Sequence, residues 1–290
     1  MPNFGQSSEQ NYEVTKVLNN NVVLAEDIGS REEIVVIGKG LGFSNAIGDI
    51  LSADNPQIDK TFVAVNKENK EKYQRLVANV DKEVIGVTEE IIAMASEELG
   101  EELDEHIHIA LADHIQFSLK RLKEGMEILN PFLAETQTLY STEYNLAKKS
   151  VALIEKRLGI EMPVAEVGFI TLHLHAARNN LKVSKTVKYT SLIKSMIEVV
   201  EEELAIKLSR ESLNHARLVT HLRFALKRIE DETPNQNPIL ATIKNNFNDA
   251  YQLAEELARM IEDRLELEVP IDEVGYIALH LQRLKKNINQ

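Results

Sequence analysis

Histidine is the side chain with the most chemical potential in this chain, because the 290 residues include eight histidines and no cysteine. Four of the histidines form two matched sets, His114 with His221 and His173 with His280, each 107 residues apart. A histidine on an apolar helical face is often a packed core residue. Leucine or tyrosine would fill that role at a smaller desolvation cost, so recurrence at one spacing leaves a packed-core role and a shared function as equal alternatives.

Three kinds of chemistry suit such histidines. A metal site could recruit Asp104 or Asp113, but Thr220 stands at the position of Asp113 in the second set and there is no HExxH motif. Acid–base catalysis is open to imidazole, although no nucleophile or oxyanion loop accompanies it. The third kind is reversible phosphorylation, in which a neutral imidazole accepts a phosphoryl group. The product adds up to two negative charges, which can make or break an interface.

The histidines lie within a longer internal repeat. Leu111–Leu122 matches Leu218–Ile229, and Pro163–His173 matches Pro270–His280, all at the same offset of 107. Separate blocks that keep one register indicate a tandem duplication. We predict copies at residues 73–183 and 184–290, joined around residues 179–187.

Each copy has the pattern of a small helical bundle. Thr88 is a candidate N-cap for a helix that ends near Gly100, and Asp104 is a candidate cap for the next helix. Apolar residues then recur at helical spacing from Ile107 to Leu122. Pro163 and Pro270 suit first helical turns.

The N-terminal segment differs, because its β-branched runs are short and separated by turn residues. Asn19–Asn21, Asp27–Gly29 and Gly38–Gly42 are the predicted turns, and Thr61–Val65 is a further strand candidate. We therefore predict a small antiparallel β domain at residues 1–64 and a linker at 65–72. A core of this size is thin, so dimerisation would help the domain to persist.

The glycine-rich segment Gly38–Phe43 lacks the spacing of a P-loop, and no βαβ unit follows it. It could be a simple glycine turn, as Asn19–Asn21 could be a hairpin turn. Alternatively, the asparagine amides and the exposed glycine backbone could contact RNA.

In its order of motifs, the whole chain after residue 10 resembles bacterial sugar-operon transcriptional antiterminators of the BglG/SacY type. The matching segments are Lys16–Val22, Gly38–Phe43, Leu111–Ile115, Gly168–His173, His221–Phe224 and Gly275–His280. The resemblance implies an RNA-binding β domain that acts as a dimer, followed by two homologous all-α domains that are regulated by the sugar phosphotransferase system. Glu105–His108 and Asn130–Glu135 look most like the glucose-type branch.

The resemblance also implies a mechanism and its residues. The β domain would bind an RNA hairpin in the leader transcript and thereby prevent formation of a terminator. A sugar-specific transport component (enzyme II) and the general carrier HPr would phosphorylate the helical domains. The implied phosphorylation sites are His114, His173, His221 and His280. The implied RNA contacts are Lys16, Asn19, Asn21, Gly38, Lys39, Gly40 and Phe43. The resemblance implies no enzyme activity, cofactor or metal.

Composition and charge bound these expectations. No apolar run approaches the ~18 residues of a membrane span, and the N-terminus lacks a signal-peptide pattern, so we expect a cytoplasmic protein. The net charge of −13 opposes loose nucleic-acid binding, and residues 1–64 carry nine acidic and four basic side chains, a net charge of −5. A DNA-binding activator with the same regulatory domains is an alternative, although residues 1–64 show no helix-turn-helix pattern. A metal-dependent helical hydrolase is a third.

Overall fold

The short β-branched runs at the N-terminus pair into one antiparallel sheet. In the computed structural model, which describes residues 10–63, 67–233 and 236–288, this sheet has the strand order β4-β1-β2-β3-β5. Its strands are β1 (Asn11–Val17), β2 (Val22–Asp27), β3 (Glu33–Ile37), β4 (Ile50–Ser52) and β5 (Lys60–Val63). The predicted antiparallel β domain is therefore confirmed. Residues 64–65 of the predicted strand Thr61–Val65 lie outside the described residues.

The central strands β2 and β3 are buried on both faces, which explains their nearly continuous apolar sequence. On one face, Val23 and Val36 pack with Leu41 and with Leu51 of β4. The other face packs against the helices that follow, where the buried partners include Tyr73, Leu76 and Ile85. The thin core of the β domain is thus enlarged by the helices within the same chain.

Two short elements of the β domain were not predicted. Strand β4 pairs with β1, and the four-residue helix α1 (Leu41–Ser44) begins after Gly40 in the glycine-rich segment. Leu41 is the buried anchor of α1, with no exposed surface. The glycine-rich segment is therefore a turn that leads into a helical turn.

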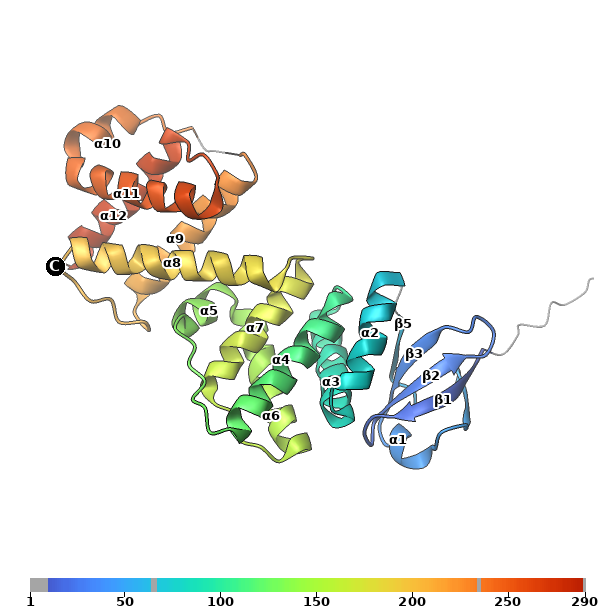
Figure 1. Ribbon diagram of the computed structural model, residues 1–290. Coiled ribbons are helices and arrows are strands. Elements are labelled where there is room, and N and C mark those ends of the chain that lie inside the picture. Colours follow the sequence, from blue (N-terminus) through green and yellow to red (C-terminus); the bar gives the residue numbers. More distant parts are fainter. Residues whose placement is uncertain (1–9, 64–66, 234–235, 289–290) are drawn as a thin grey trace, which may run out of the picture. The chain divides into compact units, whose positions relative to one another are not determined.

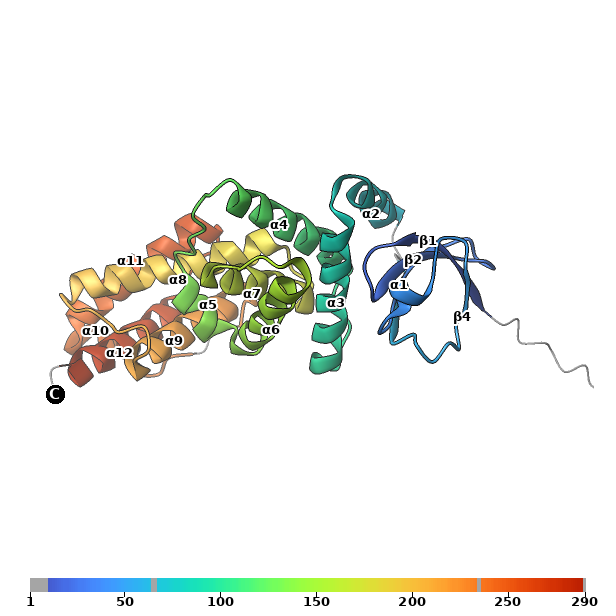
Figure 2. The same cartoon turned by 90° about the horizontal axis from the view of Figure 1, so that it is seen from below.

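The helices divide between two compact units. The first unit contains the sheet together with α2 (Lys67–Asn79), α3 (Lys82–Leu99), α4 (His106–Lys123), α6 (Ser141–Leu158) and α7 (Val164–Arg178). Figures 1 and 2 show α2 and α3 between the sheet and the other helices of this unit. Residues 67–72 of the predicted linker belong to helix α2, and residues 64–66 are not described.

The second unit contains α8 (Val183–Glu203), α9 (Leu213–Glu230), α10 (Leu240–Asn246), α11 (Asn248–Leu265) and α12 (Ile271–Ile288). It also includes α5 (Leu133–Leu139), although α5 belongs to the first copy of the repeat by sequence. Helix α5 packs against α8 and α9, whereas its counterpart α10 packs against α11 and α12. The compact units therefore differ from the two sequence copies in the placement of α5.

The helix boundaries reproduce the repeat. Helices α9, α10, α11 and α12 each begin 107 residues after α4, α5, α6 and α7, so the two copies use the same succession of elements. Gly100 ends α3 in the left-handed conformation, as expected. Thr88 is not an N-cap: α3 begins at Lys82, and the Thr88 hydroxyl donates to the carbonyl of Val84 inside the helix. Within the described residues, no helix is long and apolar enough to cross a membrane.

Candidate functional site

The asparagine turn (Asn19–Asn21) and the glycine-rich turn (Gly38–Phe43) are separated in the sequence but meet at one end of the sheet. Asn19 Oδ1 accepts hydrogen bonds from the backbone amides of Asn21 and Val22, at 2.8 and 3.0 Å. Asn21 Oδ1 accepts from the amide of Gly40 at 2.9 Å. The family resemblance implied that these two segments contact RNA, and hydrogen bonds between them hold them together.

Two glycines are required by this arrangement. A Cβ atom on Gly38 would lie only 1.7 Å from the carbonyl oxygen of Gln57, so no side chain fits there. Gly40 has φ of +73°, which favours glycine, and it precedes the first residue of α1. The backbone of this turn consequently approaches its surroundings more closely than other residue types would allow.

Several side chains of the two turns face solvent. Phe43 on α1 is 84 % exposed, and Lys39 is exposed beside it in the chain. An exposed aromatic ring can stack on a nucleobase, and an exposed ammonium group can pair with a phosphate. Lys16 is different: it is half-buried, and its Nζ donates to the carbonyl of Val77 in α2 at 2.9 Å.

The side-chain amides of the asparagine turn are occupied by a carboxylate of α3. Asn19 Nδ2 donates to Glu90 Oε1 at 2.9 Å, and Asn21 Nδ2 donates to Glu90 Oε2 at 3.0 Å. Arg157 of α6 donates to the same carboxylate at 2.6 Å. We call Asn19, Asn21, Glu90 and Arg157 the asparagine clamp. Glu90 and Arg157 were not predicted as site residues.

Close packing supports the asparagine clamp. A Cβ atom on Gly86, one turn before Glu90, would lie 2.4 Å from Asn19 Nδ2, so glycine lets the turn approach α3. A cavity of about 970 Å³ opens beside the clamp and is also lined by Lys39 and Lys60. The first unit therefore holds these amides against the helical module rather than leaving them open to solvent.

In the first copy of the repeat, His114 and His173 lie side by side, with ring centroids 4.9 Å apart. His114 Nε2 is 2.7 Å from Glu166 Oε2, and Ser118 Oγ donates to the other carboxylate oxygen at 2.9 Å. In the tautomer that carries its proton on Nε2, His114 donates a hydrogen bond to Glu166, and Nδ1 keeps the free lone pair. Burial, and then the positive charge of His114 when it is protonated, lower the pKa of His173 to about 3.

In the second copy, His221 and His280 are stacked, with centroids 3.4 Å apart and an interplanar angle of 17°. Glu273, the counterpart of Glu166, accepts two hydrogen bonds from Arg228, at 2.8 and 2.6 Å. Burial, followed by His221, Arg283 and Arg228, lowers the pKa of His280 to about 4. The repeat thus places both predicted pairs in contact but surrounds them differently.

The other four histidines pair with carboxylates. His108 and His175 are bonded to Glu89 and Glu143, at 2.7 and 3.2 Å. The remaining two pairs are His106 with Asp104, at 2.8 Å, and the buried His215 with Glu135, at 3.5 Å. These contacts fit structural roles. No group of three or more potential ligands within the described residues is arranged to hold a metal ion.

The missed partners differ in how far the sequence could have indicated them. Glu166 and Glu273 recur within the repeated blocks that begin at Pro163 and Pro270, so the repeat itself contained a signal. Glu90 and Arg157 carry no such signal for the asparagine clamp, because their contacts join residues 67 to 71 positions apart in the chain.

Comparisons with known proteins show what the chain is similar to. The CAT RNA binding domain matches residues 12–71, and the PRD domain matches twice, at residues 89–177 and 194–284. The chain is 32 % identical over 276 residues to the transcription antiterminator LicT of Bacillus subtilis (strain 168), covering 94 % of this chain and 99 % of that protein. It is 36 % identical over 280 residues to the PtsGHI operon antiterminator of the same strain, covering 96 % and 99 %. The crystal structure of GlcT CAT-PRDI aligns with a TM-score of 0.48 and 39 % identity, covering 58 % of this chain and 98 % of that one.

The chain belongs to the family of transcription antiterminators that combine a CAT RNA-binding domain with two PRD domains. It is a regulatory RNA-binding protein rather than an enzyme. Membership of this family favours an RNA-binding antiterminator over the two alternative hypotheses, a metal-dependent hydrolase and a DNA-binding activator.

Proposed function

We propose that this antiterminator acts as a homodimer in the cytoplasm and binds an RNA hairpin in the leader transcript of a sugar-transport operon. Binding prevents the terminator from forming, so that transcription continues. Phosphorylation of His114, His173, His221 and His280 by the sugar phosphotransferase system controls this activity. Enzyme II and HPr are the proposed donors.

The meeting of the two turns supports the RNA-binding role. The asparagine turn supplies amide donors and acceptors, and the neighbouring glycine-rich turn supplies the exposed Lys39 and Phe43. Together they offer the hydrogen bonds, stacking and single charges that suit unpaired bases in a hairpin. Gly38 allows the backbone to approach Gln57 closely, and Gly40 allows the left-handed conformation that precedes α1.

The asparagine clamp is the observation that carries the proposal of regulated RNA binding. Asn19 and Asn21 donate to Glu90 with the same amide groups that would donate to RNA. Because one donor cannot satisfy both partners fully, RNA binding and the clamp compete. The competing carboxylate lies in the helical module that contains His114, so a change in that module can reach the RNA-binding turn.

The geometry of the first pair supports phosphorylation at His114 and His173. Both imidazoles are partly exposed, and the low pKa of His173 keeps that ring neutral and nucleophilic at physiological pH. A phosphoryl group on either ring would place negative charge close to Glu166. Such repulsion would disturb the contact between α4 and α7 and so provide a switch.

The sugar and the domain boundaries are also proposals. We assign the glucose-type branch, supported by the runs Glu105–His108 and Asn130–Glu135, which resemble that branch. We retain an RNA-binding domain at residues 1–64 and regulatory domains at 73–183 and 184–290. Exposed apolar side chains on the β domain, Phe43, Ile47 and Ile50, would be available for dimer or RNA contacts.

Binding of the full chain to the leader RNA of a sugar-transport operon from the same genome tests the proposal. Asn19→Asp keeps the oxygen that stabilises the turn but replaces the amide donor with a negative charge, so we expect RNA affinity to fall at least about tenfold. Asn55→Asp, in an exposed turn of the same domain, is the matched control. Sedimentation of the same samples measures the dimer. Equal binding by the wild type and Asn19→Asp would refute the assignment of the RNA surface.

A further inference from the structure

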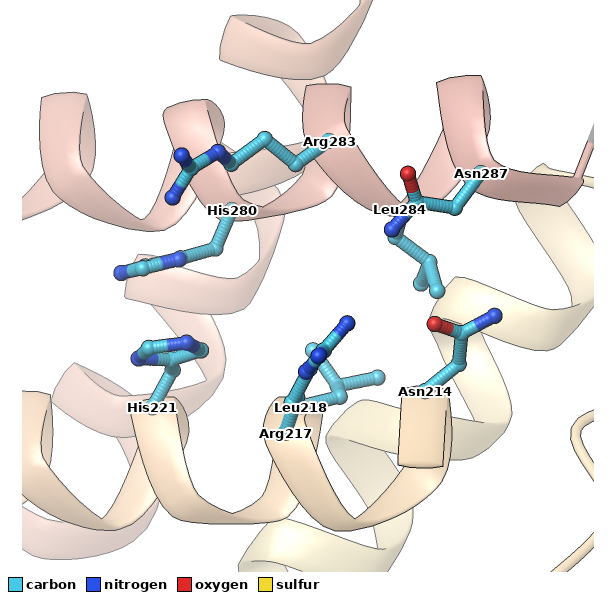
Figure 3. Close-up of a pocket in the computed structure, with 8 residues that line it drawn as sticks. All are labelled: Asn214, Arg217, Leu218, His221, His280, Arg283, Leu284 and Asn287. Atoms are coloured by element: carbon cyan, nitrogen blue, oxygen red, sulfur yellow. The ribbon is translucent and has the colours of Figure 1, made fainter. Parts of the chain in front are cut away.

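The second PRD domain contains a pocket beside His221 and His280 whose size and charge the proposed phosphorylation of these histidines does not explain. It lies between α9 and α12 and has a volume of about 450 Å³. Figure 3 shows His221 and His280 facing each other across one end, with Asn214 and Asn287 at the other end. A cavity of this size lies within the range of small-molecule sites, about 300–1,000 Å³.

Two arginines give the pocket a positive charge. Arg217 projects from α9, Arg283 projects from α12, and both line the cavity. Both are exposed, and neither forms an ion pair with a carboxylate in the described parts of the chain. Arg228 differs, because it is already neutralised by Glu273. Two arginines on facing helices without acidic partners are suited to an anion with several acceptor oxygens.

The first copy of the repeat supplies an internal comparison. At the offset of 107, Ala110 stands where α9 has Arg217, and Ala176 stands where α12 has Arg283. The first histidine pair has Glu166 as its neighbour and lacks both arginines. The first copy forms the same helices without arginines at these two positions. The fold itself therefore does not require the positive charge of the pocket.

The positive charges of these arginines affect the protonation of the imidazoles in the pocket. Burial, and then the charges of Arg283, Arg217 and Arg228, lower the pKa of His221 below its usual value. A bound anion would offset this repulsion and would accept hydrogen bonds from the arginines and from either ring. The pocket is thus electrostatically prepared for negative charge, quite apart from any phosphoryl transfer.

We propose that this pocket reversibly binds a small phosphorylated metabolite, with Arg217 and Arg283 holding the phosphate group. Asn214 and Asn287 lie at the other end of the cavity, where their amides can donate to and accept from hydroxyl groups of the ligand. The volume exceeds the needs of a phosphate group alone and leaves room for a polar body. Occupancy would cover His221 and His280, which gives the metabolite control over phosphorylation of this pair; that consequence rests on the proposed function.

Calorimetric titration of the unphosphorylated full chain tests binding directly. The probes are glucose 6-phosphate, inorganic phosphate and unphosphorylated glucose. We expect saturable binding of glucose 6-phosphate with a dissociation constant below about 1 mM, weaker binding of inorganic phosphate, and none of glucose. Inorganic phosphate binding as tightly as the sugar phosphate would overturn the metabolite assignment.

Matched variants locate the site. Arg217→Ala with Arg283→Ala should weaken binding at least about tenfold, whereas Arg259→Ala, an exposed arginine of α11 outside the pocket, should leave it unchanged. His221→Gln with His280→Gln cannot accept a phosphoryl group. If this variant still binds the sugar phosphate, the ligand is bound reversibly and not as a phosphohistidine. The proposal is refuted if neither phosphorylated probe binds saturably. It is also refuted if the double arginine variant binds as tightly as the wild type. RNA binding by the same samples is measured separately, so failure of this site and failure of the proposed function are distinguishable.

Discussion

At the scale of single residues, the two copies of the repeat differ in the contacts of a glutamate that both copies contain. Glu166 contacts His114 and accepts from Ser118, whereas Glu273 is held by Arg228 and the position of Ser118 is occupied by Ala225. A carboxylate that holds one ring nitrogen fixes the tautomer and orientation of an imidazole. We therefore expect His114 to depend on its carboxylate in a way that His221 does not.

Glu166→Gln tests this dependence. The neutral amide weakens the contact with His114 Nε2 and no longer stabilises the positive charge that the ring gains as its other nitrogen attacks phosphorus, so phosphoryl transfer to His114 should slow by at least about tenfold. Phosphohistidine is quantified after incubation with the phosphotransferase components. Glu124→Gln, an exposed carboxylate next to the end of α4, is the control. An unchanged rate for Glu166→Gln would show that the contact does not position the acceptor.

The low pKa values of the histidines predict a dependence of stability on pH. The folded chain holds His173 neutral down to about pH 3 and His280 down to about pH 4, whereas the unfolded chain protonates both near the ordinary value of 6.5. The free energy of unfolding is therefore unaffected by these two histidines above pH 6.5. It decreases as the pH falls from 6.5 toward 4, because the unfolded state then binds more protons than the folded state.

Urea denaturation between pH 7 and pH 5 measures this effect. We expect His173 to account for a loss on the order of 1–2 kcal/mol in the free energy of unfolding, so His173→Gln should flatten the profile. The exposed His106→Gln provides the comparison, and the raised pKa of His108, which acts in the opposite direction, is common to both variants. Parallel profiles for wild type and His173→Gln would contradict the assigned pKa.

At the scale of elements, the sequence predicts what is periodic and misses what is short or long-range. The offset of 107 predicted the shared succession of helices, and the asparagine and glycine turns correctly separated the longer strands. Strand β4 has three residues, too few for a period, and it is defined by its pairing with β1. Thr88 was misassigned because α3 begins seven residues earlier than a helix capped by Thr88 would, and the added turns include buried apolar residues. Helix α5 joins the second unit through contacts such as Glu135 with Arg210, which no local pattern encodes.

The docking of the asparagine turn on α3 leads to a prediction about these two elements. Glu90→Gln replaces charge-assisted hydrogen bonds with weaker ones, so the clamp should loosen and the affinity of the full chain for leader RNA should rise by about tenfold. Fluorescence anisotropy with a labelled hairpin measures it.

Glu97→Gln makes the same chemical change on the exposed part of α3, two turns beyond the clamp, and should not alter RNA affinity. If Glu90→Gln and Glu97→Gln both bind as the wild type does, the clamp does not compete with RNA.

At the scale of the whole molecule, an acidic chain that binds RNA must rely on shape and hydrogen bonds. With four basic side chains against nine acidic ones in residues 1–64, few phosphates can be neutralised. A plot of log affinity against log salt concentration should therefore have a shallow slope, of magnitude below about 3. A hairpin with a scrambled loop should bind far more weakly at every salt concentration. A steep slope, shared by both hairpins, would indicate nonspecific phosphate binding instead.

The central claim is that this chain lets transcription pass a terminator by binding the leader RNA through the asparagine turn. Single-round transcription in vitro, on a template that carries the leader and terminator of a sugar-transport operon from the same genome, tests it most directly. The account predicts that the purified full chain increases the fraction of full-length transcript and that Asn19→Asp abolishes the increase. An unchanged terminated fraction with the wild-type chain, or an equal increase with Asn19→Asp, would contradict the account.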